Sequence, residues 1–387
     1  MNLKSIFKST LTIILLVAAF AGFAQKETPK ETIVYFCSEI TPENVLKLYN
    51  ALGVDMPGKV GLKVHFGEPG NPNILNPELL RPLVEKTHPT FVETNVLYVS
   101  PRHYTESHIK VAKDHGFTFA PIDILDADEQ LTYDVADLHL KNFTKIKTGS
   151  HFENYDSYII YSHFKGHGSA GFGGAIKNIA MGMASPGGKM AQHANDIPAL
   201  SDQAASKCFQ CGRCVSQCPA NAITVDAQGP HIDASKCIGC AKCVAECPER
   251  LFRPDGKGYS EQAFLEKLVE YAYVLTKKRP MVYINVMANI SEVCDCSGKA
   301  PKPFMGDVGM VASTDIVAVD RACQDLVGAA QGLKEAFRDR NNVDAIYQLD
   351  YAEKLGMGTQ KYILIDVVTG KKITVEKAVK QVEKLKK

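Results

Sequence analysis

Two short runs of cysteine constrain this chain more than any other feature. Each run has the spacing C-x2-C-x2-C-x3-C followed by proline, and the cysteines are Cys208, Cys211, Cys214 and Cys218 in the first run and Cys237, Cys240, Cys243 and Cys247 in the second. Thiolates are soft ligands that suit iron-sulfur clusters, and two-residue gaps let a tight turn present three sulfurs to one cubane. The pattern therefore predicts two 4Fe-4S clusters.

The duplicated run is typical of bacterial two-cluster ferredoxins, in which the fourth cysteine of each run ligates the other cluster. Carried over to this chain, that arrangement gives the two clusters the ligand sets Cys208, Cys211, Cys214, Cys247 and Cys237, Cys240, Cys243, Cys218. A short strand pair is expected at 222–225 and 231–233. We therefore expect an α+β ferredoxin-like two-cluster module over residues 201–254.

Two alternatives to iron-sulfur clusters stay open for these eight cysteines. Four cysteines also bind structural zinc, although zinc usually uses pairs of C-x2-C rather than this longer run with its following proline. A disulfide knot is the other alternative, because chains in oxidising compartments favour disulfides. Iron and sulfide assays on anaerobic protein separate the three.

The first 24 residues have the pattern of a Sec-type signal peptide. Lys4 and Lys8 precede an apolar run, Leu11 to Ala24, which ends in small residues. That run is about 14 residues long, whereas a spanning helix needs about 20. We expect cleavage after Ala24, export to the periplasm and no stable membrane span afterwards. No twin-arginine pair marks export in a folded state, which leaves cluster insertion unexplained.

Composition bounds the remaining possibilities. The chain has 387 residues, so two or three compact units are expected. Apolar residues make up 45% and charged residues 22%, the balance of a globular protein. With 44 basic and 43 acidic residues, the formal charge of +1 provides no field that would attract nucleic acid, so no nucleic-acid partner is expected.

Strand-like and helix-like stretches alternate on both sides of the cysteine block. We expect strands at 32–38, 59–66, 90–95, 156–163, 281–286 and 361–367, and helices at 41–52, 77–87, 103–115, 260–276, 313–327 and 371–387. Such alternation predicts an α/β fold, a mixed and mostly parallel sheet with helices on both faces. The α/β domain would occupy residues 32–200 and 255–387, interrupted by the module.

Four segments outside the module have unusual composition. They are residues 63–70, the glycine-dense 162–178, the Cys-Asp-Cys loop at 294–296, and 307–320. Together with the position of the cysteine block, they resemble the uncharacterised iron-sulfur-centre proteins that contain domain of unknown function 362. The resemblance extends from about residue 32 to about residue 370 and implies the fold and the clusters, but it implies no substrate.

The glycine-dense segment contains G-x-G-x-x-G at Gly166, Gly168 and Gly171, directly after an expected strand. Backbone amides in such a loop can bind an anion, and Lys165 and Lys177 would add charge. A tight structural crossing explains the glycines equally well. A nicotinamide or flavin site is disfavoured, because the following helix is interrupted by further glycines and a proline.

Cys294 and Cys296 are too close in sequence for an easy disulfide, but they can present two sulfurs to a metal. The histidines that could complete such a third metal site are His65, His163, His167 and His193. The alternatives are a loop-packing pair of thiols and a redox thiol pair. Cys37 and Cys323 are expected to be buried as small apolar side chains, and Asp315 to cap a helix.

These features predict an electron-transfer protein or oxidoreductase component, whose α/β domain binds an unknown small anionic substrate or docks a redox partner. The alternative is a binding or maturation protein with purely structural clusters. His163, Lys165 and His167 are the weak catalytic candidates. A self-contained reductase requires these three residues and the 294–296 loop to meet in one pocket, whereas a carrier needs only a docking face.

Overall fold

A computed structural model describes residues 32–194, 197–255 and 260–385. The expected signal peptide at 1–24 lies outside these residues. No helix within the described ranges has the length and apolar character needed to cross a membrane.

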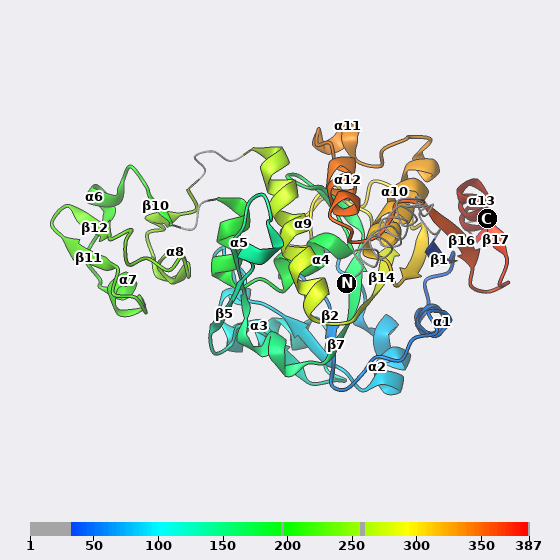
Figure 1. The fold of residues 1–387 in the computed structure, drawn as a ribbon, viewed down its shortest axis with the longest axis horizontal. Coiled ribbons are helices and arrows are strands. Elements are labelled where there is room, and N and C mark those ends of the chain that lie inside the picture. The colour runs from blue at the N-terminus through cyan, green and yellow to red at the C-terminus, as the bar shows by residue number, and fades with distance from the viewer. Residues whose placement is uncertain (1–31, 195–196, 256–259, 386–387) are drawn as a thin grey trace, which may run out of the picture. The chain divides into compact units, whose positions relative to one another are not determined.

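A mixed sheet of nine strands organises the described part of the chain (Figure 1). Its order is β17-β16-β1-β15-β14-β7-β2-β3-β4. The strands are β1 Thr32–Cys37, β2 Val60–Lys63, β3 Thr90–Glu93, β4 Ile122–Ile124, β7 Ser157–His163, β14 Met281–Met287, β15 Gly309–Ser313, β16 Tyr362–Asp366 and β17 Lys372–Ile373. Neighbours from β14 through β7, β2 and β3 to β4 are parallel, whereas β15 runs antiparallel to both β1 and β14. The predicted mixed, mostly parallel α/β fold is confirmed.

Helices cover both faces of the sheet. Along β7, Ile159 and Tyr161 pack in one apolar core, whereas Tyr158 and Ile160 pack in the other, as the two-residue repeat of a strand requires. The first core is closed by α1 Pro42–Ala51, α2 Arg81–Thr87 and α3 Thr105–Asp114. The second is closed by α4 Ala175–Gly182, α5 Pro186–His193, α9 Glu261–Lys278, α10 Ile316–Gln331, α12 Ile346–Lys354 and α13 Val375–Leu385.

Short elements connect these layers. They are the hairpins β5 Gln130–Asp134 with β6 Lys145–Gly149 and β8 Lys165–His167 with β9 Gly171–Gly173, the 3-10 turns η1 Pro77–Leu80, η2 Pro101–His103, η3 Ala136–Leu138 and η4 Ser150–Asn154, and the single-turn helix α11 Arg338–Asn341.

Local sequence explains most helix ends. Thr41 caps α1, since its side chain accepts a hydrogen bond from the backbone N–H of Asn44, and Gly53 beyond the helix end has φ +63°. Asp315 caps α10 as predicted, accepting from Val317 and Ala318. The helix predicted from residue 313 therefore begins at Ile316, and the residues before it form β15, a strand that the sequence analysis missed.

The cysteine-rich segment has a small apolar core of its own. Its elements are β10 Ala199–Leu200, α6 Ala204–Lys207, α7 Arg213–Ser216, β11 Ile223–Asp226, β12 Gly229–Ile232, α8 Lys242–Glu246 and β13 Phe252–Arg253. β11 and β12 form the expected strand pair. β10 pairs antiparallel with β13, so the chain enters and leaves this segment at adjacent positions. None of the chain's twelve cysteines, all among the described residues, is in a disulfide.

Candidate functional site

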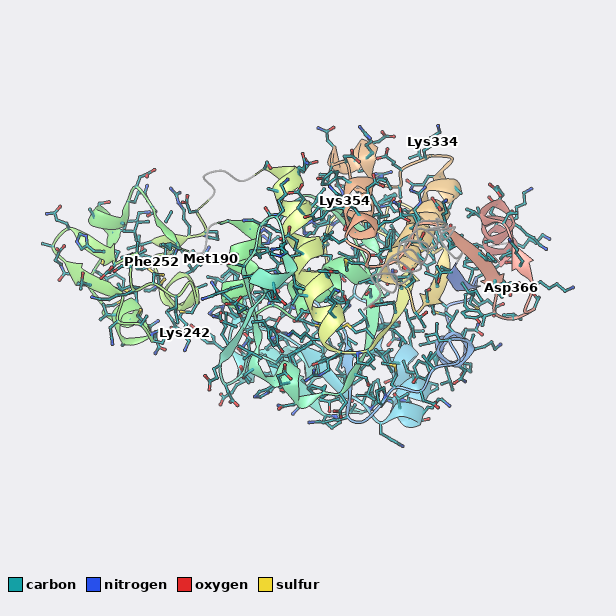
Figure 2. The ribbon with its side chains drawn as sticks, in the orientation of Figure 1. Met190, Lys242, Phe252, Lys334, Lys354 and Asp366 are labelled. Carbon is teal, nitrogen blue, oxygen red and sulfur yellow. The ribbon has the colours of Figure 1, made fainter. Side chains whose placement is uncertain are left out.

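A cavity of about 420 Å³ lies at the carboxyl ends of three parallel strands. His65 follows β2, Glu93 ends β3 and His163 ends β7, and all three line the cavity. Ligands of open α/β sheets bind beyond such strand ends. Residues of the cysteine-rich segment, Val244 and 250–254 apart from Leu251, complete the wall. Figure 2 labels one of them, Phe252.

The cavity wall is rich in cations. Its basic side chains are Arg102, Lys165, Lys177, Lys189, Arg250 and Arg253. Glu93 is the one carboxylate among the described residues that line it. Glu68 and Asp295, behind the wall, pair with Arg102 and Lys165. The cations still outnumber the carboxylates, so the cavity has a positive field, which favours an anionic ligand.

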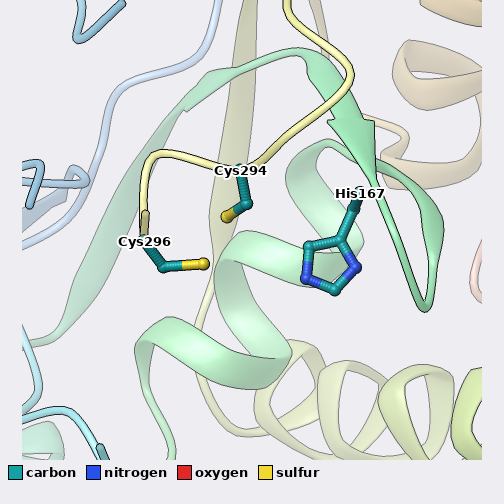
Figure 3. Close-up of side chains that lie close together, drawn as sticks. All are labelled: His167, Cys294 and Cys296. Carbon is teal, nitrogen blue, oxygen red and sulfur yellow. The ribbon is translucent and has the colours of Figure 1, made fainter. Parts of the chain in front are cut away.

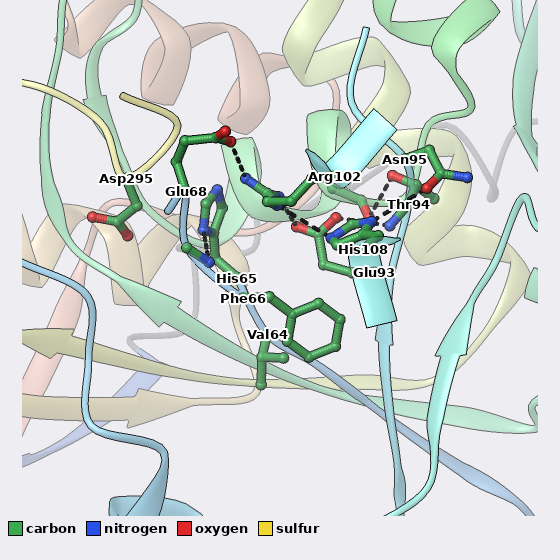
Figure 4. Close-up of polar contacts among 12 residues, drawn as sticks. Val64, His65, Phe66, Glu68, Glu93, Thr94, Asn95, Arg102, His108 and Asp295 are labelled. Carbon is green, nitrogen blue, oxygen red and sulfur yellow. Dashed lines mark hydrogen bonds and ion pairs between the residues drawn. The ribbon is translucent and has the colours of Figure 1, made fainter. Parts of the chain in front are cut away.

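A buried network of ion pairs fixes one side of the cavity (Figure 4). Glu93 Oε1 lies 3.3 Å from Lys63 Nζ and 3.5 Å from Arg102 Nη2, and Arg102 Nη1 lies 3.4 Å from Glu68 Oε2. Burial would raise the pKa of Glu93, but Lys63 and Arg102 hold it well below its usual range. Burial also lowers the pKa of Lys63 to about 8. Glu93 and Arg102 were not among the predicted site residues, although a glutamate that ends an apolar strand was a usable signal.

The loop at 294–296 is anchored by the buried carboxylate of Asp295. His163 Nδ1 lies 2.9 Å from Asp295 Oδ2, and Lys165 Nζ lies 2.8 Å from the same atom. His163 Nε2 faces the carbonyl oxygen of Ala288 at 2.6 Å. Burial would raise the pKa of Asp295, but His163 and Lys165 hold it well below its ordinary value. Because both ring nitrogens of His163 have partners, this candidate holds the loop and does not offer a nitrogen to a ligand.

Cys294, Cys296 and His167 meet at the cavity wall (Figure 3). The two sulfurs and one ring nitrogen lie within 4.8 Å of one another. Lys177 Nζ lies 3.6 Å from Cys294 Sγ. The hydrogen bond from Cys296 and the charge of Lys177 hold the pKa of Cys294 well below its usual value, despite burial. The partner thiol has the opposite shift, since sharing its proton with Cys294 raises the pKa of Cys296.

The His167 ring has a defined tautomer. Its Nδ1 accepts hydrogen bonds from the backbone N–H groups of Ser169 at 3.2 Å and Ala170 at 3.0 Å. Burial and the nearby Lys177 lower the pKa of His167 well below its ordinary value, so the ring is neutral and carries its proton on Nε2. A nitrogen that carries a proton is a donor to thiolate. Ligation of a metal would require the ring to give up both backbone hydrogen bonds.

In the glycine-dense segment, the β8–β9 hairpin, rather than an open loop, connects the end of β7 to the start of α4. A Cβ on Gly166 would lie 2.7 Å from the backbone of Glu292, and Gly171 has φ +73° with Ala345 close by. The amides at the start of α4 are already used, because Asp320 accepts from Ala175 at 2.7 Å and from Ile176 at 3.0 Å. Of the interpretations left open, the tight structural crossing fits this geometry.

The eight cysteines of the two runs line two further small cavities. One is lined by Cys208, Cys211, Cys214 and Cys247, and the other by Cys218, Cys237, Cys240 and Cys243. This division is the one that the crossed ligand pattern requires. Phe252 lines both the first of these cavities and the basic cavity, so its side chain borders both spaces. Cys37 and Cys323, by contrast, are buried as predicted, with 2% and 0% of their surface exposed.

Two solved structures resemble parts of this chain. The lactate racemase apoprotein from Thermoanaerobacterium thermosaccharolyticum is 14% identical, with a TM-score of 0.33 over 74% of this chain and 54% of that one. A protein from Thermotoga maritima is 12% identical, with a TM-score of 0.33 over 65% of this chain and 50% of that one. The matched part of this chain thus spans about half of each of these proteins.

Family comparison is more informative than these distant folds. No curated protein matches the chain. The model described as "Domain of unknown function (DUF362)" matches residues 60–325, which include the three strands whose ends form the cavity (β2, β3 and β7) and the two cysteine runs. The chain belongs to the DUF362 family.

Proposed function

We propose that this protein is an oxidoreductase that exchanges single electrons between two 4Fe-4S clusters and a small anionic substrate in the basic cavity. One observation carries the proposal. His163, Lys165, His167 and the cysteines of the 294–296 loop line the same cavity as residues of the cysteine-rich segment. A carrier that only docks a partner has no need for this convergence.

The donor set fits the clusters. Each of the two small cavities in the cysteine-rich segment is lined by four cysteines, the number of thiolates that a 4Fe-4S cluster takes. When bound, the clusters would supply one-electron transfer, which no side chain of this chain provides alone. The ferredoxin-like character of the module is part of the proposal.

The residues of the cavity would divide the remaining tasks. Lys177, Arg250 and Arg253 would bind the anion, since their side chains line the cavity and are not buried in the Glu93 network. Asp295, held by His163 and Lys165, would keep the Cys-Asp-Cys loop against the substrate. Phe252 would exclude water between the first set of thiols and the substrate.

Export remains part of the proposal as well. The mature protein would begin after Ala24 and work in the periplasm. N-terminal sequencing of protein recovered from a periplasmic fraction tests this, and a start at Met1 would contradict it.

The proposal is tested on protein purified without air. We expect iron and sulfide in equal amounts, bleaching of the visible spectrum by a low-potential reductant, and a co-purifying anion. Lys177→Gln should weaken binding of that anion about tenfold or more, the loss expected for one charge-assisted hydrogen bond. Lys334→Gln, at an exposed site away from the cavity, is the matched control.

Three results would redirect the proposal. Colourless protein with stoichiometric zinc would end the cluster assignment. Clusters that resist reduction over the accessible range of potentials would favour a binding or maturation protein with structural clusters. Equal anion affinity in Lys177→Gln and Lys334→Gln would show that the anion does not bind in the cavity.

A further inference from the structure

The geometry points to a second redox centre in the cavity: Cys294 and Cys296 form a dithiol that cycles reversibly to a disulfide, with His167 as the hydrogen-bond donor to the reacting thiolate. The inference deepens the proposed function, because it identifies where a two-electron reaction would occur. The thiol chemistry itself needs only the 294–296 loop and its neighbours.

The backbone brings the two sulfurs to one place. Residues 294–297 form a turn closed by a hydrogen bond from Ser297 N to Cys294 O at 3.1 Å. The turn is held from outside, since Glu68 N donates to Asp295 O at 3.0 Å and Asn71 Nδ2 donates to Ser297 O at 2.8 Å. With one residue between them, the two Cα atoms are about 5 to 7 Å apart, within the reach of a disulfide. Such a short ring is strained, and strained disulfides are the labile ones.

The surroundings favour thiolate chemistry over inert packing. Cys294 is 4% exposed, but both cysteines line a cavity of about 420 Å³, so a reactant can approach them. Lys177 Nζ lies 3.6 Å from Cys294 Sγ, and the neutral ring of His167 turns its protonated Nε2 edge toward the sulfurs (Figure 3). A cation and a donor beside a partly accessible thiol are the features of reactive cysteines. Cys323, on helix α10, is the internal contrast: Asn285 Nδ2 lies 3.6 Å from its sulfur, but its exposure is 0% and it is not among the residues that line the cavity.

The same geometry argues against a resident metal. A metal ion would need the lone pair of His167 Nε2, yet the two backbone N–H groups on Nδ1 keep the proton on Nε2. Metal-ligating histidines instead donate their second nitrogen to an acceptor.

The chemical step balances as follows. Closure of the disulfide from the Cys294 thiolate and the Cys296 thiol breaks one S–H bond, forms one S–S bond, and releases one proton and two electrons. Under the proposed function, the two clusters would each accept one of those electrons. With a disulfide oxidant instead, the Cys294 thiolate attacks one sulfur and displaces a thiolate. Cys296 then attacks Cys294 Sγ and displaces the second thiolate, which takes up the proton that Cys296 loses.

The test uses the whole protein equilibrated in mixtures of reduced and oxidised glutathione. After acid quenching and alkylation, the mass of the peptide that contains residues 294–296 reports the fraction of disulfide. We expect a single two-electron transition in wild type. Cys296→Ser should trap one glutathione on Cys294, and His167→Ala should slow that trapping about tenfold at neutral pH. Cys323→Ser should leave all of these results unchanged.

Two outcomes overturn the inference. One is complete alkylation of both cysteines at every glutathione ratio. The other is stoichiometric zinc that Cys294→Ser with Cys296→Ser removes. Iron is measured on the same samples, so failure of the dithiol inference can be told from failure of the cluster proposal. If the disulfide transition is missing but iron is fully present, only the dithiol inference is refuted. If the transition is normal but iron is absent, only the cluster proposal is refuted.

Discussion

The α/β region and the cysteine-rich segment are stabilised in different ways. The sheet is enclosed by two large apolar cores, in which strand and helix side chains are almost fully buried. Residues 199–253 bury only a few apolar side chains, and cysteines make up much of their core. A segment of about 55 residues with so small a core is marginal without metals or disulfides. Burial alone can stabilise the α/β region, whereas under the proposed function the cysteine-rich segment would depend on the clusters that its thiols bind.

The largest expected effect is loss of structure in the cysteine-rich segment when iron is removed. Removal of iron by a chelator under oxidising conditions should abolish the hydrogen-exchange protection of β11 and β12 and leave β7 and β14 protected, because binding free energy of a structural metal group is folding free energy. Cys247→Ser should lower the iron content by about half or more, since Cys247 is a proposed ligand of one cluster. Unchanged protection of β11 after iron loss would show that the segment folds unaided.

The next largest effect is a loss of stability that should arise only in the α/β region. Asp320→Ala leaves the amides of Ala175 and Ile176 and the side chain of Asn285 without their acceptor, and all of these groups are buried. We expect a loss of about 2–4 kcal/mol in the free energy of unfolding. Denaturant titration measures it, with Asp339→Ala on the exposed surface of α11 as the control. A loss below about 1 kcal/mol would contradict the capping role.

A smaller effect should follow when the contact between the two regions is disturbed while both stay folded. In Gly187→Ala the new Cβ would lie 2.5 Å from the carbonyl oxygen of Gly239 and 3.1 Å from Cys240 Cα, so the backbones must move apart. Iron content should stay constant while electron transfer to a cavity ligand slows about tenfold or more, as reactant positions shift. Gly168→Ala, where no atom lies within 4 Å of the new Cβ, is the matched control. Equal rates of electron transfer in Gly187→Ala and Gly168→Ala would show that the contact between Gly187 and Gly239 does not affect electron transfer.

The smallest effect is electrostatic. His151 lies 2.7 Å from Asp123 and 2.8 Å from Asp128. Burial opposes the shift, but hydrogen bonds to these two carboxylates raise the pKa of His151 above its ordinary value. The ion pairs of protonated His151 therefore stabilise the fold fully below about pH 6.5, and this stabilisation is lost as the pH rises through the raised pKa. The site is partly exposed and screened, so we expect less than about 1 kcal/mol. Unfolding midpoints of wild type and His151→Gln should converge above that pKa; a constant difference would refute the assignment.

Much of the fold could be predicted because local rules agree with it. Thr41, Pro42 and Gly53 mark the ends of α1 by their own conformational preferences. β15 could not be found in the same way, because an antiparallel strand inserted between β1 and β14 breaks the alternation that identified its neighbours. Residues 310–312 were therefore left without a predicted element, and only Ser313 was assigned to the following helix.

The site was predictable only in part. The Cys-Asp-Cys loop, Lys165 and His167 were identified from composition, and the cavity does bring them together. The roles of the histidines could be assigned only from interatomic distances. These show that His163 contacts Asp295 and that Nδ1 of His167 accepts backbone hydrogen bonds. Arg102 and Lys189 come from distant segments, and no spacing in the sequence relates them to His167.

The pairing of β10 with β13 has a consequence for how such a chain could arise. Opposite residues in an antiparallel pair lie about 5 Å apart, so residues 199 and 253 sit at neighbouring points of the backbone. Excision of everything between them would leave a gap that a single peptide linkage nearly closes, and no strand of the nine-stranded sheet would be cut. An ancestral chain could therefore have gained or lost its cysteine-rich segment in one genetic event while keeping the rest of its architecture.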